Sequence, residues 1–318
     1  MYDREIAFGP GEEFRAIRRM IRRFGPLAAG IGDDAALIHV PRGNTLAMSS
    51  DTSVENVHFR RTWLTPDEIG YRSATAALSD LAAMGATGVG MLVSLTVPKD
   101  ARGMLDGIAD GIARAARATA VRVYGGDTTS GATLSLSFTV FGNTRDPMPR
   151  DAARAGDRMY VTGKLGGPAA AVAALNAGIE PRAEWRERFA APHARIKEAR
   201  WLAGRGARAA IDLSDGLVAD AAHIAAASNV RIDLHLDRVP TVEGVGVLDA
   251  SRGGEEYELL IASAIPIDTH VFTARFGIPL TEIGAVRDGH PGVKSFAGGK
   301  SVVVARAGYD HFGSPGSQ

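Results

Sequence analysis

The chain has 318 residues, 45% of them apolar, which is enough to build one large or two ordinary domains around sizeable cores and argues against general disorder. Lysine plus arginine total 36 and aspartate plus glutamate also total 36, so the net charge is zero and nothing favours a nucleic-acid partner, whose binding normally needs a basic face. Cysteine is absent, which excludes disulfides, thiolate nucleophiles, iron–sulfur clusters and cysteine-ligated zinc.

The N-terminal end of the chain does not resemble a targeting segment. It has no apolar central run and carries acidic residues at positions 3, 5, 12 and 13. Further along, no run approaches the roughly 18–20 apolar residues that a bilayer span needs. We therefore expect a cytoplasmic protein with no membrane partner.

The first half of the chain alternates strand-like and helical patterns. Two strand-like runs at 35–40 and 45–49 flank a Pro-Arg-Gly-Asn turn. Thr65 then fits a helix N-cap, Pro66 the first helical position and Glu68 the closing position of a capping box. This helix continues through an alanine-rich stretch, which predicts that another backbone packs closely against it. Strands follow at 91–97, 121–124 and 134–141, with a helix at 106–119.

The second half restarts after two prolines within residues 145–149, and we expect a domain boundary there. A strand over Arg158–Thr162 is followed by a glycine-rich turn and an alanine-rich helix from Pro168. Strands and helices mix in both halves, which predicts a protein of the α/β (α+β) class with an N-terminal domain of residues 1–148 and a C-terminal domain of residues 149–318. The remaining expected elements are strands at 209–213, 231–236, 258–262 and 301–304 and a helix over Leu217–Ser228.

Five short segments share one design, in which carboxylates stand beside glycine or serine where an apolar run begins or ends. Each alone has a structural explanation, because aspartate is common in glycine-rich turns and at helix N-caps. The set is harder to explain in that way. Asp80 lies inside an alanine-rich helix, where an unpaired buried carboxylate is costly, and Asp127 directly follows an apolar strand. The segments are Gly30–Asp34, Ser49–Thr52, Ser79–Asp80, Gly125–Thr129 and Asp212–Gly216.

Several carboxylates without matching lysines indicate that their counter-charge is a metal. Magnesium fits best, because it takes oxygen ligands, usually carboxylates together with waters and substrate phosphates. Several Mg²⁺ ions would offset the charge of a nucleoside triphosphate beside a second phosphorylated molecule and align the attacking and leaving oxygens. Zinc is disfavoured, because the eight histidines show no ligand spacing. The pattern favours a magnesium-dependent enzyme that transfers a phosphoryl group from ATP.

Three competing motifs fail on context or sequence. The segment Gly30–Ala35 matches the dinucleotide pattern G-x-G-x-x-A, but a glycine-proline pair precedes it and a strand-like run follows, which inverts the required strand-to-helix order. The Walker pattern is absent, since Arg158 and Leu165 stand where it needs glycine and Ser/Thr around Gly163-Lys164. A G-x-S-x-G nucleophile elbow is also missing, which lowers the odds of a serine hydrolase.

The acidic segments belong to a longer series of motifs that runs through nearly the whole chain. The series is Gly30–Leu37, Ser50–Thr52 with His58-Phe59, Leu78–Ala86, Gly125–Thr129, Tyr160–Gly163, Ile211–Leu217, Gly253–Leu260 and Gly308–Phe312. In this order it resembles the thiamine-monophosphate kinase family. The resemblance implies a two-domain fold shared with aminoimidazole ribonucleotide synthetase, selenophosphate synthetase and a hydrogenase maturation protein. Its N-terminal α/β domain would pair its sheet with that of a second subunit, and its C-terminal domain would be α+β.

The family's activity, carried over, would be ATP-dependent phosphorylation of thiamine monophosphate to thiamine diphosphate, by direct in-line transfer and without a covalent catalytic residue. The resemblance assigns magnesium to Asp33, Ser49, Ser50, Asp51, Asp80, Asp127, Asp212 and Asp215. It assigns ATP contacts to Gly126, Asp127, Arg150, Ser214 and, on a poorly matched helix, Asp110, and contacts with the thiamine substrate to His58, Glu255 and the Arg306 position.

The chain departs from the family pattern at three places, of which the first keeps the charge and the last two concern the acceptor. Glu256 stands where the family usually has aspartate, residues 239–252 form a shorter segment than usual, and Arg306 replaces an expected aromatic residue. A sister enzyme of the same superfamily with another acceptor, or a nucleotide- or metal-binding protein without catalysis, are the alternatives. His58 and Glu255 favour the kinase over the sister enzyme. The retained aspartates speak against a protein without catalysis, because an inactive site has no reason to gather like charges.

Overall fold

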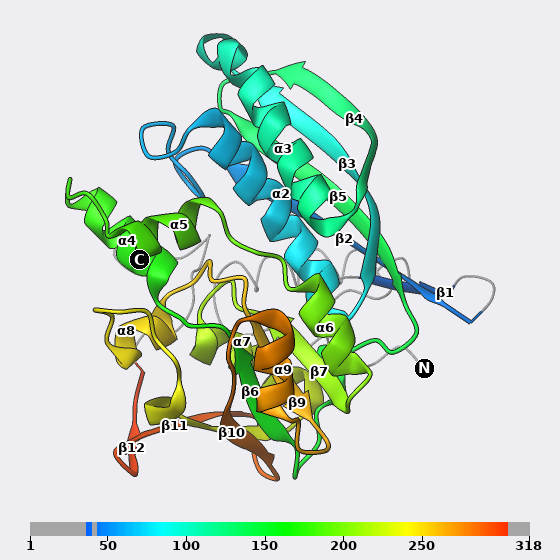
Figure 1. Cartoon of the computed structure of the whole chain (residues 1–318), viewed down its shortest axis with the longest axis vertical. Helices are drawn as coiled ribbons and strands as arrows, with labels where there is room; N and C mark the ends of the chain where they lie inside the picture. The colour runs from blue at the N-terminus through cyan, green and yellow to red at the C-terminus, as the bar shows by residue number, and fades with distance from the viewer. Residues whose placement is uncertain (1–35, 40–42, 305–318) are drawn as a thin grey trace.

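The protein is built around two mixed β-sheets, one in each half of the chain (Figure 1). The computed structural model describes residues 36–39 and 43–304. The expected strand at 35–40 is present as β1 (Ala36–His39). Of the predicted site residues, Asp33 and Arg306 lie outside the described ranges.

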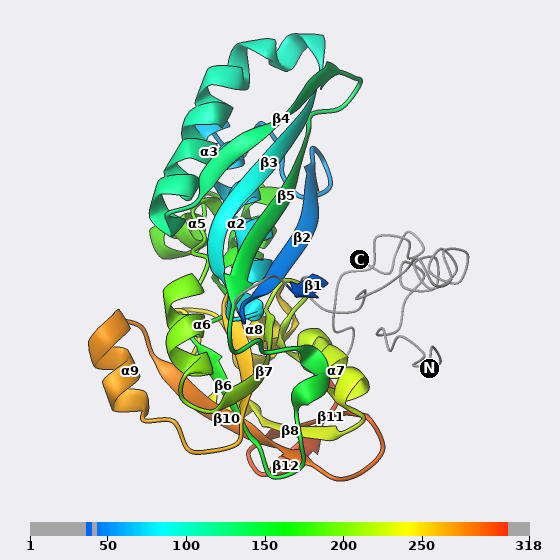
Figure 2. The ribbon, with the colours of Figure 1, turned by 90° about the vertical axis from the view of Figure 1, so that its right-hand side faces the viewer.

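The N-terminal sheet has five strands in the order β1-β2-β5-β3-β4. Neighbouring strands within this sheet are antiparallel, except for the parallel pair β3–β4. Two helices, α2 (Pro66–Ala83) and α3 (Leu105–Thr119), cover one face, and none of the described elements covers the opposite face (Figure 2). The further strands are β2 (Thr45–Val54), β3 (Thr87–Val97), β4 (Arg122–Ser130) and β5 (Ser135–Thr144), with a short 3₁₀ turn, η2, at Lys99–Met104.

Helix α2 begins as the sequence predicts. The Thr65 hydroxyl accepts a hydrogen bond from the Glu68 N–H, and the Glu68 carboxylate accepts one from the Thr65 N–H at 2.8 Å, which completes the capping box. The expected close backbone contact is with α3. A Cβ on Gly111 would lie 1.9 Å from the Asp67 carbonyl oxygen, and one on Gly70 would lie 2.1 Å from the Ile108 carbonyl oxygen. Only glycine permits this helix spacing at both places.

The C-terminal sheet has seven strands in the order β12-β11-β8-β10-β6-β9-β7, antiparallel except for β11–β8. The strands are β6 (Arg158–Thr162), β7 (Ala207–Asp212), β8 (Arg231–His235), β9 (Leu259–Ser263), β10 (Leu280–Arg287), β11 (Gly292–Ala297) and β12 (Lys300–Val302). The helices are α4 (Gly167–Asn176), α5 (Ala183–Ala190), α6 (Ile196–Ala203), α7 (Leu217–Ser228), α8 (Val247–Arg252) and α9 (Thr269–Phe276), with 3₁₀ turns η3 (Arg150–Ala152) and η4 (Leu236–Arg238).

Helix α2 connects the two halves. Near its start, Phe189 and Ala190 of α5 enter the core of the N-terminal sheet. Near its end, Ala82 and Ala83 join a cluster that contains Tyr160 of the C-terminal sheet and residues of α6. Figure 1 shows α2 running between the N-terminal sheet and helices α5 and α6. A residue in the middle of α2 can therefore contact both halves.

The four strands β2, β3, β4 and β5 are longer than predicted, and in β2 and β4 this changes where the carboxylates lie. Strand β2 continues through Asp51 to Val54, and β4 continues through Asp127 to Ser130. Asp127 was expected to follow a strand, and this prediction is wrong: it lies within β4. The cause is pairing, since β3 holds the polar Gly125–Ser130 stretch in register although that stretch is rich in glycine and polar residues.

Candidate active site

One part of the predicted metal set meets between β2 and α2. The Ser49 hydroxyl donates to Oδ2 of Asp80 at 2.5 Å. Ser49 and Asp51 pair across the sheet with Val140 and Phe138, whose buried side chains define the helix-covered face. Cross-strand partners point to the same side of a sheet, so Ser49 and Asp51 lie on the face that is covered by α2, the helix of Asp80.

The other predicted ligands of the N-terminal sheet lie on its uncovered face. Asp127 of β4 is paired in register with Ser94 of β3, and Ser94 is paired with Ser137 of β5. Ser137 is in turn paired with Thr52 of β2, and the two hydroxyl oxygens lie 2.8 Å apart. Ser50 lies two residues before Thr52 in β2, so its side chain belongs to the same face, because side chains alternate along a strand. Strands β2 and β4 are separated by β5 and β3. A single copy of the chain therefore does not bring Asp127 to Asp80.

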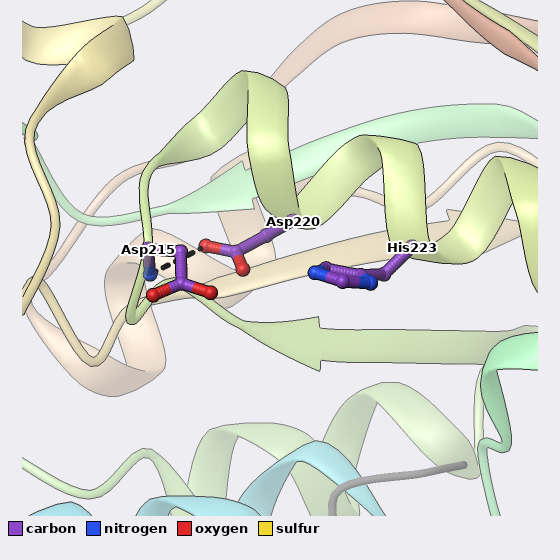
Figure 3. Close-up of side chains that lie close together, drawn as sticks. All are labelled: Asp215, Asp220 and His223. Atoms are coloured by element: carbon purple, nitrogen blue, oxygen red, sulfur yellow. Dashed lines mark hydrogen bonds between the residues drawn. The ribbon is translucent and has the colours of Figure 1, made fainter. Parts of the chain in front are cut away.

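The C-terminal acidic segment forms a tight loop between β7 and α7. Asp212 ends β7 with 3% of its surface exposed. The backbone N–H groups of Asp215 and Gly216 both donate to Oδ2 of Asp220, at 3.2 and 3.0 Å. Figure 3 shows Asp215, Asp220 and His223 on one side of α7, with the Asp215–Asp220 hydrogen bond dashed. Asp220 thus fixes the backbone of this loop through its side-chain carboxylate.

The loop concentrates negative charge. Burial, together with the charges of Asp215 and Asp212, raises the pKa of the Asp220 carboxyl well above its usual value, while the Gly216 N–H and the charge of Arg150 oppose this. Carboxylate oxygens of Asp215 and Asp220 and a ring nitrogen of His223 lie within 4.8 Å of one another. Such an oxygen-rich group fits a hard cation such as Mg²⁺, because a cation would relieve the mutual repulsion of the carboxylates.

A second loop, residues 253–258, is hydrogen-bonded directly to the first. The Glu255 N–H donates to the Ser214 carbonyl at 2.8 Å, and the N–H groups of Glu256 and Tyr257 donate to the Leu213 carbonyl at 3.0 and 2.9 Å. Glu255 and Tyr257 have φ angles of 63° and 52°, conformations that cost about 1–3 kcal/mol each in residues with side chains. These hydrogen bonds hold the strained backbone, so the two loops form one rigid unit.

The three glutamates of this second loop have separate partners. Oε1 of Glu256 accepts from the Gly166 N–H at 2.5 Å, at the start of α4, while burial raises the pKa of its carboxyl well above the usual value. Among the described residues, Oε2 of Glu256 has no hydrogen-bond partner. The buried Glu258 accepts from Nε and Nη2 of Arg195, at 2.8 and 2.5 Å, and from the Thr162 hydroxyl at 2.6 Å. Glu255 instead forms an ion pair with Arg72 of α2.

The two residues assigned to the acceptor, His58 and Glu255, lie near the same helix. Nδ1 of His58 accepts a hydrogen bond from the Val54 N–H at 3.0 Å, which fixes the ring orientation. The His58 carbonyl lies 3.5 Å from Nη2 of Arg72, the nitrogen that also contacts Glu255. The structure therefore brings these two residues to one arginine, although they are 197 positions apart in the sequence.

The predicted nucleotide contacts have different positions. Arg150, at the start of η3, lies close enough to Asp220 to affect its pKa, and Ser214 lies in the first loop. Gly126 lies in β4, where a Cβ would be 1.6 Å from the Val93 carbonyl oxygen. Asp110 lies on the exposed side of α3, whose buried residues face α2 and the sheet.

Sequence reasoning missed three residues that organise these loops: Arg72, Arg195 and Asp220. Arg72 and Asp220 are charged residues inside apolar, alanine-rich stretches, the same signal that singled out Asp80. Applied to every charged residue rather than to aspartates beside glycine or serine, this signal would have found these two. Arg195 lies among the charged residues of 195–200 and gives no such signal.

Family models match both halves of the chain. Residues 32–144 match the N-terminal domain of AIR synthase related proteins, and residues 154–294 match their C-terminal domain. A solved structure of the E. coli hydrogenase maturation protein HypE, at 19% identity and a TM-score of 0.68 over 91% of this chain and 96% of that chain, shares the fold. The molecule is thus a two-domain protein of the AIR synthase related class, as the resemblance implied.

More specific relatives are curated thiamine-monophosphate kinases. That of Escherichia coli (strain K12) is 35% identical over 306 residues, 90% of this chain and 92% of the relative, and that of Mycobacterium tuberculosis (strain H37Rv) is 33% identical over 323 residues, 96% and 93%. A solved structure of AaThiL complexed with AMPPCP and TMP has a TM-score of 0.82 and 29% identity, covering 95% of this chain and 97% of that one. The chain belongs to the thiamine-monophosphate kinase family.

Proposed function

We propose that this protein transfers the γ-phosphate of ATP to thiamine monophosphate and releases thiamine diphosphate and ADP. One observation of the structure carries the proposal beyond family membership. The loop with Asp212, Ser214 and Asp215, assigned to metal and nucleotide, is hydrogen-bonded directly to the loop with Glu255, assigned to the acceptor. Such a unit can hold donor and acceptor phosphates in a fixed relation, which is the main requirement of phosphoryl transfer.

We propose that several Mg²⁺ ions act at this site. The residues that would hold them are Asp33, Ser49, Ser50, Asp51, Asp80, Asp127, Asp212 and Asp215. When bound, they would neutralise phosphate charge. The carboxylate oxygens gathered at Asp215 and Asp220 support a hard cation here. Arg150 would bring positive charge to the nucleotide from the protein itself.

We propose that transfer is direct. A phosphate oxygen of thiamine monophosphate would form the new bond to the γ-phosphorus while the bond to the β,γ-bridging oxygen breaks and ADP leaves. The chain has no cysteine and no nucleophile elbow to form a covalent intermediate. Rapid quench with γ-labelled ATP and no acceptor should leave the protein unlabelled, and stoichiometric covalent label would overturn this part of the proposal.

We also propose a homodimer through the uncovered face of the N-terminal sheet. Leu92 and Tyr124, 41% and 57% exposed, and the partly buried Phe141 contribute apolar surface to β3, β4 and β5. Tyr124 and Phe141 are in contact, with ring centroids 5.5 Å apart. A second copy over this face would cover that surface and bring its own Asp127 to the side of the sheet that carries Ser50 and Asp127.

The described helices include none that is long and apolar enough to cross a membrane. A cytoplasmic location, expected from the sequence, is part of this proposal.

The acceptor side carries the family departures. The Glu256 carboxylate accepts a hydrogen bond from the N–H of Gly166, the residue directly before α4. The 239–252 segment is held to the turn before α4, because the Leu165 N–H donates to the Pro240 carbonyl and the Val242 N–H to the Leu165 carbonyl. Replacing Arg306 by tryptophan tests whether the missing aromatic matters, since it should lower KM for thiamine monophosphate several-fold with kcat unchanged.

The deciding assay combines purified protein, ATP, Mg²⁺ and thiamine monophosphate, with chromatographic detection of thiamine diphosphate. Parallel reactions contain thiamine instead of its phosphate, or omit Mg²⁺, and an Asp80→Asn preparation controls for a contaminating kinase. We expect product only with the complete mixture and wild-type protein. Nucleotide turnover without thiamine diphosphate would favour a sister enzyme with another acceptor.

A further inference from the structure

Arg72 lies in the middle of α2 with only 2% of its surface exposed. Its guanidinium contacts three separate segments of the chain. Nη1 donates to the Phe189 carbonyl of α5 at 2.6 Å, while Nη2 pairs with Oε1 of Glu255 and lies 3.5 Å from the His58 carbonyl. The guanidinium carbon also lies 4.4 Å from the centre of the Phe189 ring. A single arginine side chain thus links α2 to α5, to the loop of Glu255 and to the loop of His58.

A buried arginine is costly unless its charge and its donors are matched. Here the carboxylate of Glu255 supplies the charge, and carbonyl oxygens from two other segments accept the donors. The arrangement uses both terminal nitrogens of a planar fork, which a lysine ammonium cannot reproduce. Arginine is thus the side chain whose shape matches this set.

The arrangement leaves Glu255 available to a ligand. Its side chain is 29% exposed, against 3% for Arg72, and the contact with Arg72 is made through Oε1. Its backbone is held in a left-handed conformation by the hydrogen bond to Ser214. The backbone of Glu255 and its Oε1 atom are therefore held in place, while the rest of the carboxylate is exposed.

We propose that Arg72 is a positioning residue for the acceptor: it orients the Glu255 carboxylate and the His58 loop together, so that a cationic aromatic group such as the thiazolium of thiamine monophosphate is recognised across the two halves of the protein. This inference rests on the proposed function for the identity of the acceptor. The arginine itself does not contact the acceptor. Glu255 stands between the two positive charges and offsets their repulsion.

A purely structural role predicts a different outcome. Arg186 also ties α5 to the N-terminal half, donating to the Glu68 carboxylate at 2.8 Å and to the Trp63 carbonyl at 3.1 Å, but its contacts include neither Glu255 nor His58. Arg186→Met is therefore the matched control for loss of interface contacts. Arg72→Lys keeps the charge and removes the fork, and Arg72→Met removes both.

The test measures binding of thiamine monophosphate by calorimetry without ATP or Mg²⁺, followed by steady-state kinetics of the same proteins. We expect Arg72→Met to weaken thiamine monophosphate binding by about tenfold or more, as for loss of a charge-assisted hydrogen bond, and Arg72→Lys by roughly threefold. The KM for ATP should change less than about twofold in both, and Arg186→Met should leave both constants within about twofold. In the double variant Arg72→Met/Glu255→Gln, the loss should not exceed that of the weaker-binding single variant, because both changes break one unit.

Three results would overturn the inference: unchanged or tighter acceptor binding in Arg72→Met, equal losses for acceptor and ATP, or losses that multiply in the double variant. If Arg72→Met does not fold, Arg72→Lys decides alone, and wild-type affinity in that variant rejects positioning. Wild-type protein that binds thiamine monophosphate but makes no thiamine diphosphate contradicts the proposed function and leaves the binding comparison valid. Wild-type protein that does not bind it rejects both.

Discussion

Replacing Arg195 by methionine should destabilise the protein strongly, because it removes the two charge-assisted hydrogen bonds of the buried Glu258 and leaves it only the Thr162 hydroxyl and the more distant Arg188, 3.8 Å away, among the described residues. Only 2% of the Glu258 side chain is exposed, and Arg195 supplies two of its hydrogen bonds, at 2.8 and 2.5 Å. Removing one member of a buried ion pair costs about 3–5 kcal/mol. At roughly 2 °C per kcal/mol, the lower end of the range for chains of 150–250 residues, Tm should fall by about 6–10 °C.

The assay is thermal unfolding by circular dichroism, with two companion variants. Glu258→Gln combined with Arg195→Met removes both charges and should recover most of the loss, since the uncompensated carboxylate is gone. Arg182→Met breaks an exposed contact with Glu243, 3.4 Å long with side chains 56% and 89% exposed, and should cost no more than about 1 kcal/mol. If Arg195→Met behaves like Arg182→Met, or the double variant is worse than the single one, the reasoning about an uncompensated buried charge is wrong.

Three further predictions concern the site and the assembly. Asp80→Asn and Asp127→Asn should each lower activity at least about a hundredfold while Tm holds or rises, since each removes one of a set of like charges; a collapsed Tm with normal activity per folded molecule would show structural roles. Glu256→Gln should gain stability over wild type as pH rises from about 4.5. The raised pKa of the buried Glu256 means that its protonated carboxyl stabilises the wild-type fold at low pH, and this contribution is lost as the group ionises. The difference in Tm between the variant and wild type should grow from pH 5 to 8, and a constant difference would contradict the assignment. Light scattering at micromolar concentration should report twice the 33.3 kDa chain mass, whereas a fully active monomer would rule out the dimer.

The local elements with strong chemical signals could be predicted closely. The capping box at Thr65, the helix Leu217–Ser228 and the strand Arg158–Thr162 have the predicted bounds or starts. Helices α5, α6, α8 and α9 and strands β10 and β11 were not predicted. In α5, the arginines and glutamates between a few apolar residues give a weak pattern, and its stability comes from packing against the N-terminal half.

The site was predicted as a set of residues but not as an arrangement. Serine, aspartate and glutamate at motif positions indicated metal and phosphate chemistry, because oxygen donors suit Mg²⁺ whatever the fold. Their grouping depends on strand register, where one residue decides the face. Asp51 and Asp127 therefore lie on opposite faces of one sheet, which no pattern within either segment shows.

The sequence by itself determined the family, the class of chemistry and the helix ends that depend on neighbouring residues, because these follow from residue types and short-range hydrogen bonds. Only the tertiary structure decided which carboxylates meet, that Asp220 holds the loop before α7, and that Arg72 joins His58 to Glu255. These contacts link positions far apart in the chain. Their formation depends on strand pairing and on the burial of charge in a packed core, and both are properties of the whole fold.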